Sequence, residues 1–560
     1  MKSFNLITEP WIKVVEISSG HEKKVSLEEI FRNAQNYLCL SGEMKSQDLS
    51  ILRLLLAILT TVYTRVDAEG NPYEWIELDD NFRFVRLVDD YDEDDVLDTW
   101  EDLYEQGHFS EAVVAYLKKN EERFDFFGEH PFYQVSEREW NETKKTVNGK
   151  ETEDGTVIGI RQINRCISES GNSPSLFSPR SFLKKDDIVL DELIRWIIMY
   201  QDYTGTTDKA KISMQNKVSN SAGWLYKLSP VYANGNNLFE TMMLNMVLIN
   251  ECDHGEYVNQ FPIWEYCSIS KYIEDSKKML VPDNIAALYT NWSRLINIVW
   301  ENEKPIIHVA GLPVLDNSNA FVEPMTVWKK NKDDFVPAIK SIKSNDINKA
   351  MWRDFGMYVN VNSDNNEDEQ PGIVSWLKFL KDNECIKKDM MIDLSSVSVI
   401  NDGNATSQMP ALEISDDMSI KAEVLFDNSI NYWPKRIEDI ISSTQKIGNE
   451  YNKLTRSIGM IRFNDSGRAS AFAKKRGSEF YAKLNSPFKD WLSNLTNDDD
   501  REKKLNEWKD TLMTIVQDRL NSLMNGATYM EISGYSNEKG NIENIFTLIN
   551  HFRNKIRNIL

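Results

Sequence analysis

The sequence lacks most of the motifs by which a catalytic or nucleotide-binding site can be recognised. It contains no G-x-x-x-x-G-K-[ST] phosphate loop, no H-E-x-x-H, no G-x-S-x-G and no His-Asp dipeptide. Its six histidines are dispersed over 560 residues, which leaves few ligands for a metal. These absences argue against an enzyme and predict a binding module or complex subunit without metal or cofactor.

Cysteine is also scarce, and its spacing excludes two further classes of protein. The five residues form no C-x-x-C pair, so neither a zinc knuckle nor a disulfide framework is predicted. The N-terminus lacks the basic and then apolar layout of a secretion signal, and no apolar run approaches the length of a membrane span. We therefore expect a reduced, cytoplasmic protein that does not engage a membrane.

Positive charge is under-represented but unevenly distributed. The 65 basic and 87 acidic residues give a net charge of −22, which by itself argues against nucleic acid. Between Asn428 and Ser486, however, eleven residues are basic and five are acidic, whereas Asp89–Asp98 is strongly acidic. A binding partner responds to the local electrostatic field rather than to the net charge of the whole chain, so nucleic-acid binding is not excluded.

The apolar pattern predicts an α+β fold, with a large mixed N-terminal domain followed by a C-terminal four-helix bundle. Ser46 is expected to cap an apolar core helix that runs to about Arg65. Strand patterns end near residue 426, so we place the domains at 1–426 and 427–560. Four amphipathic patterns then predict an antiparallel bundle, over Asn428–Ile461, Gly467–Leu495 with a kink at Pro487, Asp499–Met524 and Asn541–Ile559.

The stretch from Gly171 to Leu248 combines two polar loops with apolar helices. The first loop is rich in turn-forming residues and carries Leu176, Phe177 and Arg180. A helix is predicted from about Asp187 to Tyr200, and apolar periodicity resumes at Leu238. The polar segment between them, Thr206 to Ala222, carries Lys209, Lys211 and Lys217. Long polar loops that persist in a compact domain are often functional.

Three further features have both a structural and a functional interpretation. The strands Leu394–Ile400 and from Glu413 predict a hairpin whose long tip carries Thr406, Ser407 and Gln408. For His130, a packed structural role is favoured over a catalytic one, because no motif supplies a partner. For the basic cluster at the end of Glu323–Lys330, a solvated face is favoured.

A succession of short motifs resembles the CasA family, the large subunits of the type I-E CRISPR surveillance complex Cascade. The resemblance covers nearly the whole chain, in order. It is carried by Asn5-Leu6-Ile7, Pro10-Trp11-Ile12, Glu129–Phe132, Leu176-Phe177, Gly235–Asn245, Glu323–Thr326 with Trp328, and the hairpin at Gln408. It implies a non-catalytic subunit with an N-terminal α+β domain and a four-helix bundle.

The resemblance also implies a role and its partners. The role is to recognise the protospacer-adjacent motif (PAM) in invading double-stranded DNA, to start strand separation and to present the target to a recruited helicase–nuclease. The other partners implied are the CRISPR RNA and the subunits CasB, CasC, CasD and CasE. Leu176, Phe177 and Arg180 then correspond to the loop that docks on the 5′ handle of the CRISPR RNA and the complex base.

The PAM loop of the family falls within Thr204–Gly223, where Lys209, Lys211 and Lys217 stand in place of successive glycines of some relatives. The family's separate PAM-contacting lysine has no counterpart near Asp316–Asn319. Gln408, preceded by Thr406 and Ser407, matches the glutamine that wedges the duplex open. Two alternatives remain open at this point: an RNA-processing or nuclease subunit that uses His130, and a purely architectural subunit.

Overall fold

The chain forms two compact units, each made of segments that are not continuous in the sequence. The computed structural model describes residues 3–163, 184–205, 210–213, 222–249, 259–278, 281–337, 349–359, 368–401, 410–429, 432–536 and 542–559. The first unit comprises Met1–Asn348, Glu367–Leu377 and Leu394–Asp416, and the second comprises Lys349–Asn366, Lys378–Asp393 and Asp417–Leu560. The simpler division at residue 426 stays a prediction.

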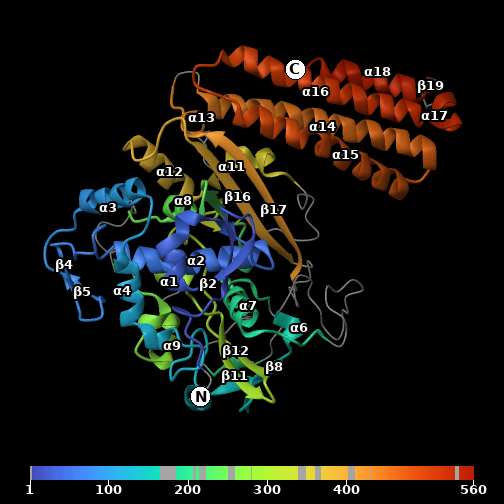
Figure 1. Ribbon diagram of the computed structural model, residues 1–560. Helices are drawn as coiled ribbons and strands as arrows, with labels where there is room; N and C mark the ends of the chain where they lie inside the picture. Colours follow the sequence, from blue (N-terminus) through green and yellow to red (C-terminus); the bar gives the residue numbers. More distant parts are fainter. Residues whose placement is uncertain are drawn as a thin grey trace. The chain divides into compact units, whose positions relative to one another are not determined.

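Helix α2 (Lys45–Tyr63) is the centre of the first unit (Figure 1). Every residue after Lys45 is buried, because the helix is apolar on most of its faces. Contrary to the expectation from the sequence, this helix is by length and composition apolar enough to cross a membrane, the one such helix among the described residues, but it is fully buried, as a core helix is. The core-helix prediction is confirmed, but the predicted cap is wrong: Met44 occupies the N-cap position and Ser46 lies inside the helix.

The remaining helices of the first unit are shorter. Helix α1 begins with a side-chain cap, since the hydroxyl of Ser26 accepts a hydrogen bond from the backbone of Glu29 at 3.1 Å. The bounds are α1 (Leu27–Asn33), α3 (Glu93–Gln106), α4 (Glu111–Lys119), α5 (Glu137–Glu142), α6 (Ile160–Ile163), α7 (Leu190–Tyr203), α8 (Leu238–Asn245), α9 (Ile269–Lys278) and α10 (Ile285–Tyr289), while α12 (Gly372–Asp382) bridges the two units in sequence.

Most strands belong to small sheets. The first has the order β2-β1-β3, and β4 pairs with β5. A six-stranded sheet has the order β11-β12-β9-β6-β7, with β8 paired to β12. The bounds are β1 (Ile12–Glu16), β2 (Glu22–Val25), β3 (Tyr37–Leu40), β4 (Ile76–Leu78), β5 (Phe84–Leu87), β6 (Lys145–Val147), β7 (Lys150–Thr152), β8 (Thr156–Ile158), β9 (Ala210–Ile212), β11 (Arg294–Glu301) and β12 (Lys304–Gly311).

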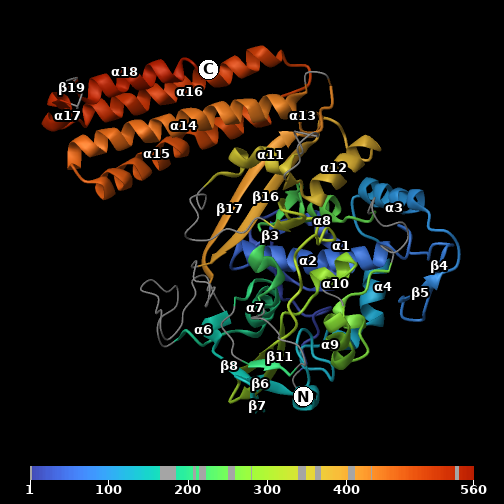
Figure 2. The ribbon, with the colours of Figure 1, turned by 180° about the vertical axis from the view of Figure 1, so that it is seen from behind.

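Two further sheets have three strands each. One has the order β14-β13-β15 and the other β10-β16-β17. In the second, β16 and β17 form the predicted hairpin, with longer strands than the sequence indicated (Figure 2). The bounds are β10 (Val231–Asn234), β13 (Trp328–Asn331), β14 (Asp334–Pro337), β15 (Asp368–Glu369), β16 (Met391–Asn401) and β17 (Pro410–Lys421).

The C-terminal part of the chain is helical, which confirms the predicted fold class. Helix α14 lies against α15, where side chains at Gly448 and Gly459 would collide with the facing helix: a Cβ at Gly448 would lie 2.2 Å from the hydroxyl of Tyr481. Helix α15 continues through Pro487. The bounds are α11 (Phe355–Tyr358), α13 (Ala422–Leu425), α14 (Trp433–Phe463), α15 (Ser466–Ser493), α16 (Arg501–Asn525), α17 (Tyr529–Ser533) and α18 (Ile545–Ile556), with a small β18 (Tyr535–Ser536) and β19 (Ile542–Glu543) sheet.

A buried ion pair fixes α2 to a distant turn of the first unit. The guanidinium of Arg53 donates to both carboxylate oxygens of Glu323, at 2.9 and 2.8 Å, and neither side chain is exposed. The same carboxylate accepts the indole N–H of Trp224 at 2.6 Å and the backbone N–H of Met325 at 3.0 Å. The Tyr289 ring lies 3.9 Å from the guanidinium carbon. The bidentate pairing and the two further hydrogen bonds to the carboxylate offset much of the cost of burying the two charges.

A third ionisable group, Asp202, lies in the last turn of α7 near this ion pair. Its side chain is almost fully buried, and this burial raises its pKa to about 7, although the positive charge of Arg53 acts in the opposite direction. The negative charge of Glu323 adds to the increase. The cluster therefore holds one carboxyl group whose charge changes near neutral pH.

We expect Glu323→Gln to lower the free energy of unfolding by about 3–5 kcal/mol, because it leaves the Arg53 charge buried without its counter-charge. The measurement is urea unfolding of the isolated chain. Glu77→Gln is the matched control: Glu77 pairs with Arg86 at 2.7 Å, but both are exposed, so the change should cost at most about 1 kcal/mol. Equal losses for the two variants would contradict this account.

Asp202 also predicts a pH dependence. Since its pKa is higher in the folded than in the unfolded chain, the folded state binds the proton more tightly, and stability falls as pH rises from about 4 to about 7. Asp202→Asn removes this contribution. Urea unfolding at a series of pH values should show the variant gaining stability over the unmodified chain as pH rises through this range. Parallel profiles would disprove the assignment.

Candidate nucleic-acid interface

The polar segment between α7 and α8 is not one uninterrupted loop, contrary to the sequence-based expectation. Residues 210–212 form β9, which lies between β12 and β6, with Lys211 opposite Gly311 and Thr146. Ala210 and Ile212 are buried and Lys211 is half-buried. Burial, followed by the positive charge of Arg294, lowers the pKa of Lys211. In the sequence, the apolar-polar-apolar order of these three residues was the one indication of a strand.

The two ends of this segment are held together at their base. The backbone N–H of Gly223 donates to the carbonyl of Thr204 at 2.9 Å, and the guanidinium of Arg294 donates to the carbonyl of Gly205 at 3.0 Å. A Cβ at Gly223 would lie 2.1 Å from the carbonyl oxygen of Asp202, so only glycine permits this approach. The described residues that flank the segment, Thr204 and Gly223, are thus joined directly to each other.

The predicted wedge hairpin is supported by described strands. Strand β16 runs to Asn401 and β17 starts at Pro410, and β10 flanks the pair on the β16 side. The amide of Asn234 on β10 donates to the hydroxyl of Ser395 on β16 at 2.6 Å. The strands that would carry the tip are therefore part of a sheet.

Of the nine residues assigned to nucleic-acid contact or docking, the structure describes only Lys211. The other eight lie outside the described residues, and their roles stay predictions. They are Leu176, Phe177, Arg180, Lys209, Lys217, Thr406, Ser407 and Gln408.

The hairpin of β13 and β14 carries a cluster of exposed lysines whose functional role the sequence did not favour. Lys329, Lys330 and Lys332 are all exposed, and none of them forms an ion pair within the part of the chain that the structure describes. Lys330 lies on the same face of β13 as Trp328, because side chains alternate along a strand. The cluster was visible in the sequence, but its place on a hairpin tip was not.

An exposed aromatic ring lies on the face of β13 that carries Trp328 and Lys330. Phe321 is 49% exposed, and its ring contacts Trp328 and Phe335 with centroids 5.4 and 5.6 Å away. Cations next to an exposed aromatic ring suit a surface that holds phosphates and stacks on bases. The exposure of Phe321 could not be read from the sequence, because apolar residues of this kind are usually buried.

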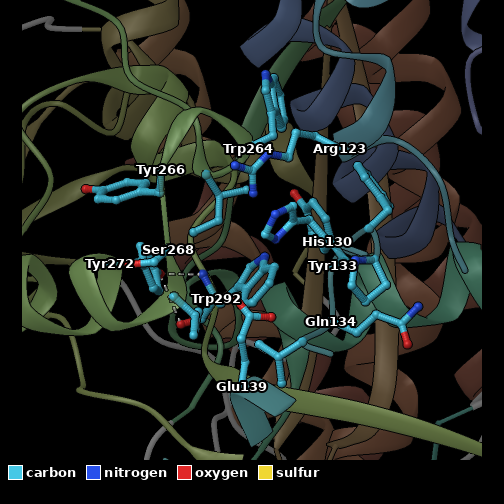
Figure 3. A pocket seen from close by; sticks show the side chains of 15 residues that line it. Arg123, His130, Tyr133, Gln134, Glu139, Trp264, Tyr266, Ser268, Tyr272 and Trp292 are labelled. Atoms are coloured by element: carbon cyan, nitrogen blue, oxygen red, sulfur yellow. Dashed lines mark hydrogen bonds between the residues drawn. The ribbon is translucent and has the colours of Figure 1, made fainter. Parts of the chain in front are cut away.

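His130 lines a small cavity rather than an active-site cleft. Figure 3 shows the imidazole among the side chains of Arg123, Tyr133, Trp264 and Trp292. The cavity measures about 60 Å³, which has room for a few water molecules but not for a nucleotide. The arrangement favours the structural role of His130 and gives no support to a nuclease site.

The described residues also offer no evident metal site. No group of three or more His, Cys, Asp or Glu side chains is gathered among them in a way that could hold a metal ion. The polar features of the first unit that remain are the basic hairpin, the lysine segment around β9 and the base of the β16–β17 hairpin.

Comparisons with known proteins agree with this arrangement. A comparison with curated proteins finds no match. Among solved structures, Thermobifida fusca Cse1 is 20% identical with a TM-score of 0.74, and the match covers 100% of this chain and 98% of that one. Cse1 from Acidimicrobium ferrooxidans is 18% identical with a TM-score of 0.70, and the match covers 100% and 98%. A chain described as part of a CRISPR RNA-guided surveillance complex is 13% identical with a TM-score of 0.67, and the match covers both chains fully.

These identities are low, so the structural likeness establishes the fold. The family is established by a separate comparison. The model of the family described as CRISPR-associated protein Cse1 matches residues 5–518, which is most of the chain. The chain therefore belongs to the CRISPR-associated protein Cse1 family.

Proposed function

We propose that this chain is the large subunit of a type I-E Cascade complex, and that it recognises the PAM of invading double-stranded DNA, starts unwinding and helps to recruit the helicase–nuclease. Membership of the Cse1 family supports this proposal. The observation on this chain that supports it most is the β13–β14 hairpin, which carries the exposed Lys329, Lys330 and Lys332 and whose Trp328 and Phe335 contact the exposed ring of Phe321.

The charge distribution fits a protein that must bind DNA only in the right place. A net charge of −22 repels duplexes from most of the surface. The lysines of the β13–β14 hairpin provide a local site for phosphates, so that contact depends on orientation. Sequence specificity then comes chiefly from pairing with the guide, as in other RNA-guided systems.

The remaining assignments form part of the same proposal. Leu176, Phe177 and Arg180 would dock on the 5′ handle of the CRISPR RNA and on the base of the complex. CasB, CasC, CasD and CasE are the other subunits proposed as partners of the chain. Lys209, Lys211 and Lys217 would approach the PAM. Because Lys211 projects from a sheet strand, we assign it a phosphate rather than a base. Thr406, Ser407 and Gln408 would separate the strands beside the PAM, with Gln408 as the wedge.

The alternatives make different demands on the structure. A nuclease subunit would need a site able to hold a nucleotide, and the small cavity beside His130 does not provide one. A purely architectural subunit would need no exposed cations next to an aromatic ring. The β13–β14 hairpin therefore favours the DNA-binding role over both.

The proposal is tested by binding of PAM-variant duplexes to the surveillance complex assembled with and without this chain. With the chain, binding should differ between duplexes that carry a matching and a mismatched PAM, and without it this difference should disappear. A complex that assembles poorly without the chain, but shows no PAM preference with it, would leave only the architectural role. Metal-dependent cleavage that is abolished in His130→Ala would instead favour the nuclease.

The β13–β14 hairpin makes a separate prediction. Lys329→Ala with Lys330→Ala should weaken binding of all duplexes alike, and should reduce the slope of log affinity against log salt by about one for each phosphate that the variant no longer neutralises. Lys119→Ala, an exposed lysine on α4, is the control and should change neither quantity. A changed PAM ranking would mean that the hairpin reads bases, and no change at all would assign it to a solvated surface.

A further inference from the structure

The N-terminus of α2 has no cap from its own sequence. Met44, at the N-cap position, offers no side-chain acceptor, and the backbone N–H of Asp48 already donates to the carbonyl of Met44 at 3.0 Å. The first helical N–H groups, those of Lys45 and Ser46, therefore need acceptors from elsewhere. Leaving such donors unpaired next to a core would be costly.

The missing acceptor is Glu413, which lies 367 residues further along the chain, on β17. Its carboxylate accepts the backbone N–H of Ser46 at 2.8 Å and that of Lys45 at 3.3 Å. The hydroxyl of Ser46 also donates to it. A carboxylate at this position also interacts favourably with the positive end of the helix dipole. The contact is thus a helix cap supplied by a strand.

The surroundings of Glu413 place its charge close to the buried part of the unit. Burial raises the pKa of Asp48 in the first turn of α2, and the Glu413 carboxylate adds to the increase, while Lys45 opposes it. Burial also raises the pKa of Tyr232 to about 12, again with a contribution from Glu413. Glu413 is therefore held among groups of α2 and β10 rather than in open solvent.

We propose that Glu413 is a positioning residue that fixes the β16–β17 hairpin to the N-terminus of α2. Glu413 lies three residues after Pro410, the first residue of β17. On the other strand, Ser395 is held by Asn234. A strand that carries a wedge must be fixed to something that does not move, and a helix buried along its length provides that support. What the hairpin does when it is fixed rests on the function proposed above.

Two variants separate positioning from simple helix capping. Glu413→Ala removes the acceptor for both Lys45 and Ser46. Adding Met44→Asp supplies a local cap, because the extended backbone of Met44 (φ −146°, ψ 153°) suits an N-cap aspartate. The double variant therefore restores the cap of α2 but does not restore the link between α2 and the β16–β17 hairpin. Lys119→Ala, on α4, serves as the unrelated surface control.

The first readout is amide hydrogen exchange of β16 and β17 in the assembled complex, which does not depend on what the hairpin tip does. In Glu413→Ala, exchange of the residues nearest the tip should accelerate by about tenfold, equivalent to about 1.4 kcal/mol. Adding Met44→Asp to Glu413→Ala should restore the midpoint of thermal unfolding, but hydrogen exchange near the tip should stay fast. The proposal would be overturned if Glu413→Ala left the exchange rates unchanged. It would also be overturned if adding Met44→Asp returned the accelerated exchange to its original rate.

The second readout is the rate of R-loop opening on a fully paired target and on one with a pre-opened bubble. Glu413→Ala should slow opening of the paired target several-fold, with or without Met44→Asp, and the bubble should remove the defect. If exchange accelerates as expected but neither Glu413→Ala nor Gln408→Ala affects opening, the positioning role holds and the wedge function fails. If Gln408→Ala slows opening while Glu413→Ala changes neither readout, the positioning role fails and the wedge stands.

Discussion

The first unit depends on a pair of opposite charges that have no contact with water. Arg53 and Glu323 lie 270 residues apart in sequence, and their contact joins the central helix to the turn that precedes β13. Because a buried charge without a partner is far more costly than a matched pair, the geometry around both groups is tightly constrained. The hairpin with the exposed lysines begins five residues after Glu323, at the buried Trp328. The position of its base is therefore also constrained by the ion pair.

The same principle recurs along α2. Arg65, two residues after the helix ends, donates to both oxygens of Glu265 at 2.8 and 3.0 Å, and the hydroxyl of Tyr116 donates to one of them at 2.5 Å. Apolar packing alone gives a helix many similar orientations, whereas bidentate pairs accept few. Together with Glu413 at its start, these contacts fix α2 at both ends and near its middle. The charges therefore contribute to the specificity of the fold rather than to its stability alone.

The sequence predicted what depends on local pattern and failed where partners are distant. The core character of α2, the strands of the Gln408 hairpin and the main bundle helices were all predicted, because each depends on the residue pattern within a short stretch of sequence. Ser46 was wrongly made a cap because its hydroxyl binds a residue that no local pattern points to. The strand at Lys211 was missed because three residues give little periodicity, and its partners lie on β6 and β12. For the candidate site, the sequence shows which residue types are present, but it does not show which side chains are exposed or which residues they contact.

The cap that Glu413 provides has a consequence for how the chain is made. Synthesis proceeds at about 5–20 residues per second, so roughly 20–70 s separate the appearance of Ser46 from that of Glu413 on the ribosome. Until then the start of α2 has no permanent acceptor, and neither Glu265 nor Glu323 is available during much of that time. Contacts of such high sequence separation make the first unit a slow-folding structure with high contact order. The last of these acceptors, Glu413, is therefore translated only when nearly three quarters of the 560 residues have been made.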